Sequence, residues 1–239
     1  MTSEGKSDTD KWAATKHAKY AYAYDKGGKL SSFFGVSGIP HAALIDASGT
    51  IVWTGHPGEL SESLIDKAIT GALTKPLWEW APSAKDVKNA LLKHSYKSAL
   101  DGAAKLAATD DGPAIVKAIE GMVQGRIDGM KADYSKGNFL GAEDAATALQ
   151  KDLEGLPGKD DAVKMLADVK ANKEAVPVLK AQKQIAKLRA AGLSKSKEID
   201  AAIEDLKKIA KDVPGTYAAT EASAFVVALQ KAKAAKKGA

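Results

Sequence analysis

The sequence predicts an α/β domain over residues 1–73, followed by an all-α region of helical hairpins over residues 83–239. Nine of the fourteen aromatic residues lie before position 81, in the part of the chain that also holds the strand-like runs. Beyond residue 83, β-branched runs vanish and Ala, Lys, Leu and Asp dominate, as is typical of helices. Residues 74–82 carry two prolines and two tryptophans, which predicts a linker packed on a domain surface.

Three segments of the first domain have the composition of strands. Residues 18–25 alternate small and aromatic side chains, residues 41–46 form a short apolar run, and residues 50–55 are β-branched and aromatic. Because only the short turn 47–49 separates the last two segments, we expect them to form a β-hairpin.

Helices are expected around these strands. They should cover residues 7–17, 28–35 and 60–73. Ser7 can cap the first helix, with Asp10 three residues further on, and Ser61 or Glu59 can open the last. The predicted order is therefore helix, strand, helix, strand, strand, helix.

The second region shows helical spacing interrupted by breakers. Breaks are expected at 110–113, 135–138, 155–158, 190–194 and 213–216. Apolar side chains recur at helical intervals at Ala145, Leu149, Leu153 and Leu156, and again at Ile199, Ile203, Leu206 and Ile209. The segments 137–169 and 199–230 each predict a helical hairpin. Both resemble tetratricopeptide-type helix pairs, and plain antiparallel bundling is the equal alternative.

The positive charge does not indicate nucleic-acid binding. The net charge is +5, but residues 1–75 hold eight lysines and eight acidic residues, and four lysines lie in the last nine positions. Such a tail is typical of a solvated helix end. Arg126 and Arg189 are the only arginines, whereas recognition of bases and phosphates relies heavily on arginine. We therefore expect no nucleic-acid partner.

Location and redox chemistry are constrained by what the sequence lacks. No apolar run approaches the roughly 20 residues of a membrane span. The polar start MTSEGKSDTDKW has no apolar core of a signal peptide, so a cytoplasmic location is expected for the sequence as written. An upstream signal segment missing from it would change this to an extracytoplasmic one. The absence of cysteine excludes disulfides, thiolate metal sites and thiol catalysis within these residues.

The segment FGVSGIPHAALIDASGTIVWTGHP resembles the thioredoxin superfamily, specifically its redoxin or TlpA-like thiol–disulfide oxidoreductases. The matching elements are Phe34-Gly35-Val36, Gly38-Ile39-Pro40, Ala42 to Asp46, Gly49 and Ile51 to Gly55. The segment AYDKGGKL before them is also characteristic, with Asp25 ending a strand. The resemblance covers about residues 1–73 and is most specific over 24–60.

The resemblance implies a substrate-binding segment at Ile39, Pro40 and His41. The family's proline is cis, and the residue before it, here Ile39, pairs through its backbone with an extended substrate. Where the family often has threonine after the proline, this sequence has His41, which either places a titratable group beside the site or points to the surface.

The sequence departs from the family at the reactive thiols. In the family, a strand and a helix carrying Cys-x-x-Cys precede the region matched here, and Met1-Thr2-Ser3 aligns with the end of the following strand. The fold implied is thus an incomplete thioredoxin-like fold. Three accounts stay open: a fragment of a longer redox protein, a minimal redox-inactive scaffold, or a sheet completed by a separate chain. The parent activity is thiol–disulfide oxidoreduction, and this chain is expected to lack it. The alternative function is a non-catalytic protein that holds a peptide or partner.

Other candidate sites are weaker, and we expect no catalytic residue, cofactor or metal. The four histidines lack metal-ligand spacing, although His41 and His56 can be neighbours across the hairpin. Residues 26–29 (Lys-Gly-Gly-Lys) lie where phosphate loops do, but they lack the spacing and the Ser/Thr of a Walker loop, so a helix-starting turn is expected. Asp160 and Asp161 are expected to complement a helix dipole.

Overall fold

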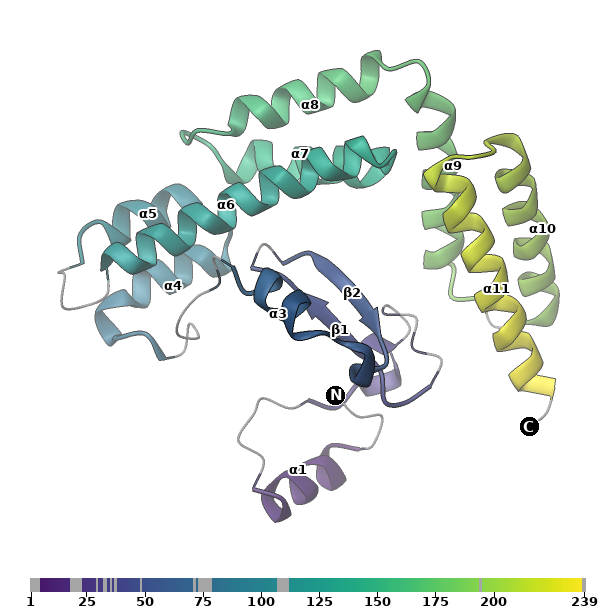
Figure 1. The fold of residues 1–239 in the computed structure, drawn as a ribbon, viewed down its shortest axis with the longest axis horizontal. Helices are drawn as coiled ribbons and strands as arrows, with labels where there is room; N and C mark the ends of the chain where they lie inside the picture. The colour runs from purple at the N-terminus through teal and green to yellow at the C-terminus, as the bar shows by residue number, and fades with distance from the viewer. Residues whose placement is uncertain are drawn as a thin grey trace. The chain divides into compact units, whose positions relative to one another are not determined.

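The computed structural model describes most of the chain and divides it into two compact units (Figure 1). The described residues are 5–17, 23–28, 30–31, 34, 36, 38–47, 49–70, 72, 79–106, 112–193 and 195–237. The first unit comprises Met1–Ile45 and Ile51–Lys67, and the second comprises Asp46–Thr50 and Ala68–Ala239. The described part is mostly helical, with one small sheet.

The first unit is built around a β-hairpin. Its elements are α1 (Lys6–Thr15), the single turn η1 (Lys26–Gly28), β1 (Ala42–Ile45), β2 (Ile51–Gly55), η2 (Pro57–Glu59) and α3 (Glu62–Ala68). The expected hairpin, first helix and last helix are confirmed. Residues 18–22 of the expected first strand lie outside the described residues, and within the described residues the sheet has two strands. Of the helix expected at 28–35, Leu30 and Ser31 are described, and both are helical.

The helix starts in this unit confirm one predicted cap and correct another. The N-cap of α1 is Gly5, so Ser7 lies inside the helix instead of capping it. In the first turn of this helix, the backbone N–H and the hydroxyl of Thr9 both donate hydrogen bonds to the Gly5 carbonyl. At α3, the Ser61 hydroxyl accepts a hydrogen bond from the Leu64 N–H at 3.3 Å, as predicted.

The hairpin is antiparallel and slightly irregular. Cα partners are Ala42 with Gly55, Ala43 with Thr54, Leu44 with Trp53 and Ile45 with Ile51, and the register shifts between Leu44 and Ile45. The turn is closed by the Asp46 N–H, which bonds the Thr50 carbonyl at 2.9 Å, and Gly49 takes a positive φ of 87°. The indole of Trp53 lies over Gly55, where an added Cβ would be 2.9 Å from the ring.

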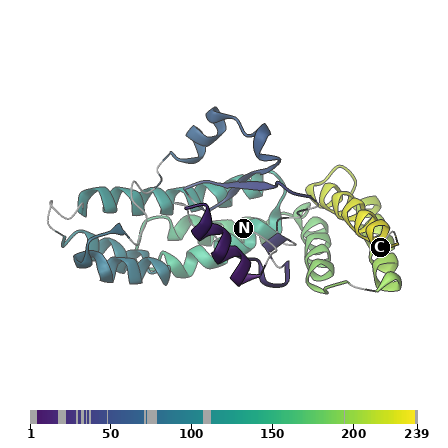
Figure 2. The same cartoon turned by 90° about the horizontal axis from the view of Figure 1, so that it is seen from below.

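In the described part of the second unit, the regular secondary structure is helical (Figure 2). Its elements are η4 (Pro82–Ala84), α4 (Lys85–Leu92), α5 (Tyr96–Ala103), α6 (Gly112–Ser135), α7 (Phe139–Asp152), α8 (Lys159–Ala171), α9 (Ala175–Ala190), α10 (Ser196–Asp212) and α11 (Tyr217–Lys237). The pairs α7–α8 and α10–α11 pack as the two predicted helical hairpins. Whether they are tetratricopeptide-like stays a prediction.

The predicted breaks coincide with helix ends at all five places. At 110–113, Gly112 and Pro113 form the first turn of α6, a position at which proline is tolerated. Two further turns were not predicted, at 93–95 and 172–174. Residues 74–78 of the expected linker lie outside the described residues.

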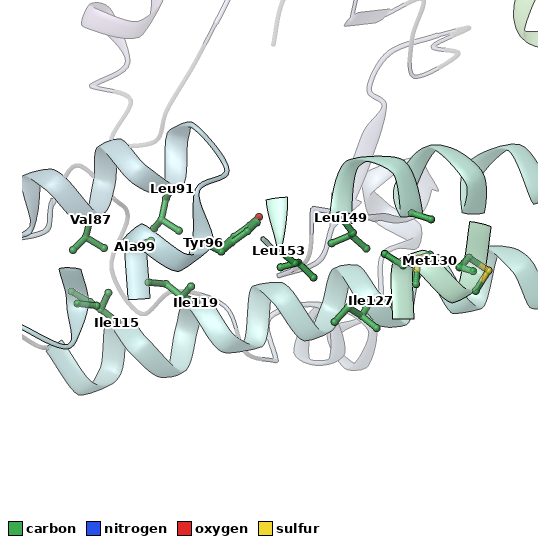
Figure 3. Packing of buried hydrophobic residues seen from close by; sticks show 14 of the residues in the cluster. Val87, Leu91, Tyr96, Ala99, Ile115, Ile119, Ile127, Met130, Leu149 and Leu153 are labelled. Atoms are coloured by element: carbon green, nitrogen blue, oxygen red, sulfur yellow. The ribbon is translucent and has the colours of Figure 1, made fainter. Parts of the chain in front are cut away.

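The helical unit contains two hydrophobic cores. The first is formed by α4 to α8 (Figure 3), and its fully buried side chains include Ile119, Met130, Leu149 and Leu153. The second is formed by α9 to α11, and it buries the predicted stripe Ile199, Ile203, Leu206 and Ile209. In the other predicted stripe, Ala145 and Leu156 are partly buried beside Leu149 and Leu153.

Candidate functional site

The predicted substrate-binding segment lies immediately before β1. The Ile39-Pro40 peptide bond is cis, as the resemblance implies. The Ile39 side chain is 91% exposed, the highest value among the exposed large apolar side chains of the described residues. An isolated exposed apolar residue is common, but this one opens the hairpin at the position expected to contact a substrate.

His41 is not placed as a freely accessible group. The residue is half-buried, and its Nε2 atom is shielded from solvent without a hydrogen-bond partner among the described residues. A buried unpaired polar atom costs about 1–3 kcal/mol. Ile39 and Pro40 are therefore the exposed members of the predicted segment.

Asp25 fixes the loop that leads toward this segment. Its carboxylate is buried and accepts hydrogen bonds from the backbone N–H groups of Leu30 and Ser31, at 3.0 and 2.8 Å, and from the Ser31 hydroxyl at 2.8 Å. A carboxylate satisfies the free N–H groups at a helix start. The adjoining Gly28 has a positive φ of 66°, and its N–H bonds the Asp25 carbonyl. This is the helix-starting turn expected at 26–29.

The hairpin beside Ile39 is apolar, and its strand residues are at most half-buried in the described part. No residue of β1 or β2 is buried, and Ile45, Ile51 and Val52 are 50%, 40% and 42% exposed. Among the described residues up to position 67, the buried ones are Thr9, Ala13 and Asp25. An isolated two-stranded hairpin is at best marginally stable in water. The first unit therefore presents an apolar surface without a core of its own in the described part.

No group of three potential metal ligands occurs among the described residues. Of the possible pair His41 and His56, the Nδ1 atom of His56 accepts the Gly58 N–H at 3.1 Å and caps η2. Asp160 and Asp161 lie in the first turn of α8 as predicted, and Asp161 pairs with Lys131 at 3.0 Å.

A polar cluster that the sequence did not predict joins α5, α6 and α7. Arg126 Nη1 donates to Asp152 Oδ2 at 2.8 Å and to the Tyr96 hydroxyl at 3.1 Å, and its guanidinium lies 5.5 Å from the centre of the Tyr96 ring. His94 Nδ1 lies 3.4 Å from the same carboxylate oxygen. Burial alone would lower the pKa of Arg126, but the hydrogen bond to Asp152 and the effects of Tyr96 raise it overall. This keeps the guanidinium charged.

The polar groups of this cluster bond one another. A single carboxylate oxygen accepts from Arg126 and lies beside His94, so the arrangement ties three helices together. Its only signal in the sequence is that Arg126 is one of two arginines in the chain.

The comparisons with known proteins add no relative. No protein-family model, curated protein or solved structure matches the chain. Among the described helices, none is both long and apolar enough to span a membrane.

Proposed function

We propose that this chain is a redox-inactive relative of the redoxin or TlpA-like proteins, which binds an extended peptide segment at Ile39 and the adjoining hairpin. The observation that carries the proposal is the 91% exposure of Ile39 at the entrance to a hairpin in which no residue is buried. The order of the Ile39-Pro40 segment, two antiparallel strands and helix α3 also supports it, because this is the order that the resemblance implies.

Binding at this position would combine backbone and side-chain contacts. The N–H and C=O of Ile39 can pair with an extended backbone, as in β-strand addition. Burying the Ile39 side chain would contribute about 1.5–3 kcal/mol. Cover over Ile45 and Ile51, which are partners across the two strands, would remove further apolar surface from water. A partner with apolar side chains at alternating positions fits this surface best.

The absence of thiols argues against catalysis by these residues. Thiol–disulfide exchange requires a thiolate that attacks a disulfide and forms a mixed disulfide. The chain has no cysteine, so no residue of it can take that role. We expect no turnover in an insulin-reduction assay with dithiothreitol, and turnover above the blank would contradict this part of the proposal.

Binding can be tested on an array of synthetic nine-residue peptides with alternating apolar positions. The full chain is compared with Ile39→Asp, and with Leu92→Asp as the matched control, because Leu92 on α4 is also highly exposed, at 71%. A charge at Ile39 should weaken bound peptides at least about tenfold, since each 1.4 kcal/mol is a factor of ten.

The two variants separate the possible results. The proposal predicts that the Ile39→Asp chain loses the peptides that the wild type and the Leu92→Asp chain retain. Equal binding by all three chains, or a loss only in Leu92→Asp, would move any binding to the helical unit and refute the proposal. Circular dichroism of each variant checks that the helices remain intact.

A further inference from the structure

The two helical cores meet at the turn between α6 and α7. The core of α4 to α8 and the core of α9 to α11 share Phe139, which packs against both. Phe139 also contacts the Tyr134 ring edge-on, at a centroid distance of 5.4 Å. The Cβ of Tyr217, the first residue of α11, lies 3.7 Å from where a side chain at Gly137 would begin. The helices α6, α7 and α11 therefore come together at the turn 136–138.

Gln182 is the only buried polar residue of α9, and its side chain reaches this turn. It is 1% exposed. Its Oε1 accepts the Leu140 N–H at 3.0 Å, while its Nε2 donates to the Gly137 carbonyl at 3.2 Å and to Asn138 Oδ1 at 3.3 Å. Both amide protons and one acceptor position are thus used. A buried amide is costly unless bonded, so these three bonds select one position of α9 against the turn.

The neighbouring bonds make the turn a firm attachment point. Asn138 Oδ1 also accepts the Gly141 N–H at 3.2 Å and caps α7, and Asn138 Nδ2 donates to Asp133 Oδ1 at 3.1 Å. A second polar contact joins α9 to α7, because Lys183 Nζ pairs with Glu143 Oε2 at 2.6 Å. Gln182 therefore binds a group that is itself anchored to both α6 and α7.

We propose that the hydrogen bonds of Gln182 act as a latch between the two helical cores. Because of this latch, α9 to α11 unfold only when α4 to α8 unfold as well. The apolar contacts of Phe139 and of Leu179 on α9 with the first core are non-directional, whereas the three hydrogen bonds of Gln182 fix the register of α9 and break together. Without the latch, the two cores become separate cooperative units. This inference does not depend on the proposed function of the first unit.

The test is amide hydrogen exchange of the full chain, resolved by helix. In the wild type, the slowest-exchanging amides of α7 and of α10 should report the same free energy of opening. This free energy should fall in the same way for both helices as low concentrations of urea are added. The variant Gln182→Met has a similar volume and lacks all three bonds. It should speed exchange of the slowest α10 amides at least about tenfold relative to those of α7, as expected when a unit opens locally.

The matched control is Gln184→Met, because Gln184 is exposed on the same helix. It should leave both exchange rates unchanged. The proposal is overturned if Gln182→Met changes α7 and α10 equally or changes neither. It is also overturned if the wild type already opens the two cores separately, a measurement that stands even when the variant does not fold.

Discussion

Removal of the Asp152 carboxylate should measurably weaken the helical unit. In Asp152→Ala, the Arg126 guanidinium loses its partner while staying mostly shielded, since the side chains of Arg126 and Asp152 are 20% and 14% exposed. The Tyr96 hydroxyl remains the only described hydrogen-bond partner of Arg126, and it carries no charge to compensate the guanidinium. The perturbation thus leaves a nearly buried charge unpaired at the contact of α5, α6 and α7.

The size of the effect follows from this burial. Breaking a fully buried ion pair from one side costs about 3–5 kcal/mol. Because both groups keep some contact with water, we expect a smaller loss, about 2–3 kcal/mol in the free energy of unfolding. An exposed pair offers the control. Lys97 and Asp101 are 53% and 56% exposed at 2.9 Å, so Asp101→Ala should cost at most about 0.5 kcal/mol.

The assay is urea unfolding followed by circular dichroism at 222 nm, which reports on the helices. We expect a lower midpoint for Asp152→Ala with little change in slope. The reasoning fails if Asp152→Ala costs no more than Asp101→Ala. It also fails if the double variant Arg126→Met/Asp152→Ala is no more stable than Asp152→Ala, because removal of the unpaired charge should recover part of the loss.

Two further predictions concern a glycine and a tyrosine. Gly158 has a φ of 94°, and a Cβ there would lie 2.4 Å from Ile127 Cδ1, whereas Gly192 has a φ of 59° and open space. In thermal unfolding, Gly158→Ala should therefore lose clearly more than the roughly 1 kcal/mol expected for Gly192→Ala, and equal losses would refute the steric argument. Burial, and then the charge of Glu221, raises the pKa of Tyr217. The folded state thus holds the phenolic proton more tightly, and stability should fall as pH rises above about 10. Tyr217→Phe should lessen this alkaline loss in urea unfolding from pH 8 to 11.5, and identical curves for variant and wild type would contradict it.

Local patterns predicted much of the helical unit. The turns at 155–158 and 213–216 were predicted from their glycines. In the structure, Gly155, Gly158 and Gly215 all take positive φ, which glycine allows at low cost. The turn at 93–95 was missed for the opposite reason. His94 takes a φ of 57°, which is uncommon for a residue other than glycine and is not expected from a histidine in the sequence. Its side chain also contacts Asp152.

Contacts between distant segments could not be predicted. Gln182 bonds Leu140 across 42 residues, and Arg126 bonds Asp152 across 26. In sequence, each is one polar residue on a helix, and nothing in the local spacing distinguishes it from a solvated one. Packing of the helices decides which polar residue becomes buried.

The hairpin and its neighbours were predicted with mixed success. The alternation and turn over 41–55 suffice for a hairpin, and Ser61 caps α3 as predicted because its short polar side chain can reach a free N–H group. The bonds of Asp25 to Leu30 and Ser31 were not predicted. The first strand, expected at 18–25, falls mainly on residues outside the described part. The role of Ile39 stays a prediction, since exposure alone does not identify a ligand.

We propose that a bound peptide covers the hairpin surface beside Ile39, whereas the helical unit buries its own cores without a partner. The most direct measurement is amide hydrogen exchange of β1 and β2 in the full chain, with and without a peptide selected on the array. We predict fast exchange of the hairpin amides in the free chain, slow exchange of α7, and at least about tenfold slower hairpin exchange on binding. Hairpin amides in the free chain that are as protected as those of α7, or that are unaffected by bound peptide, would contradict the account.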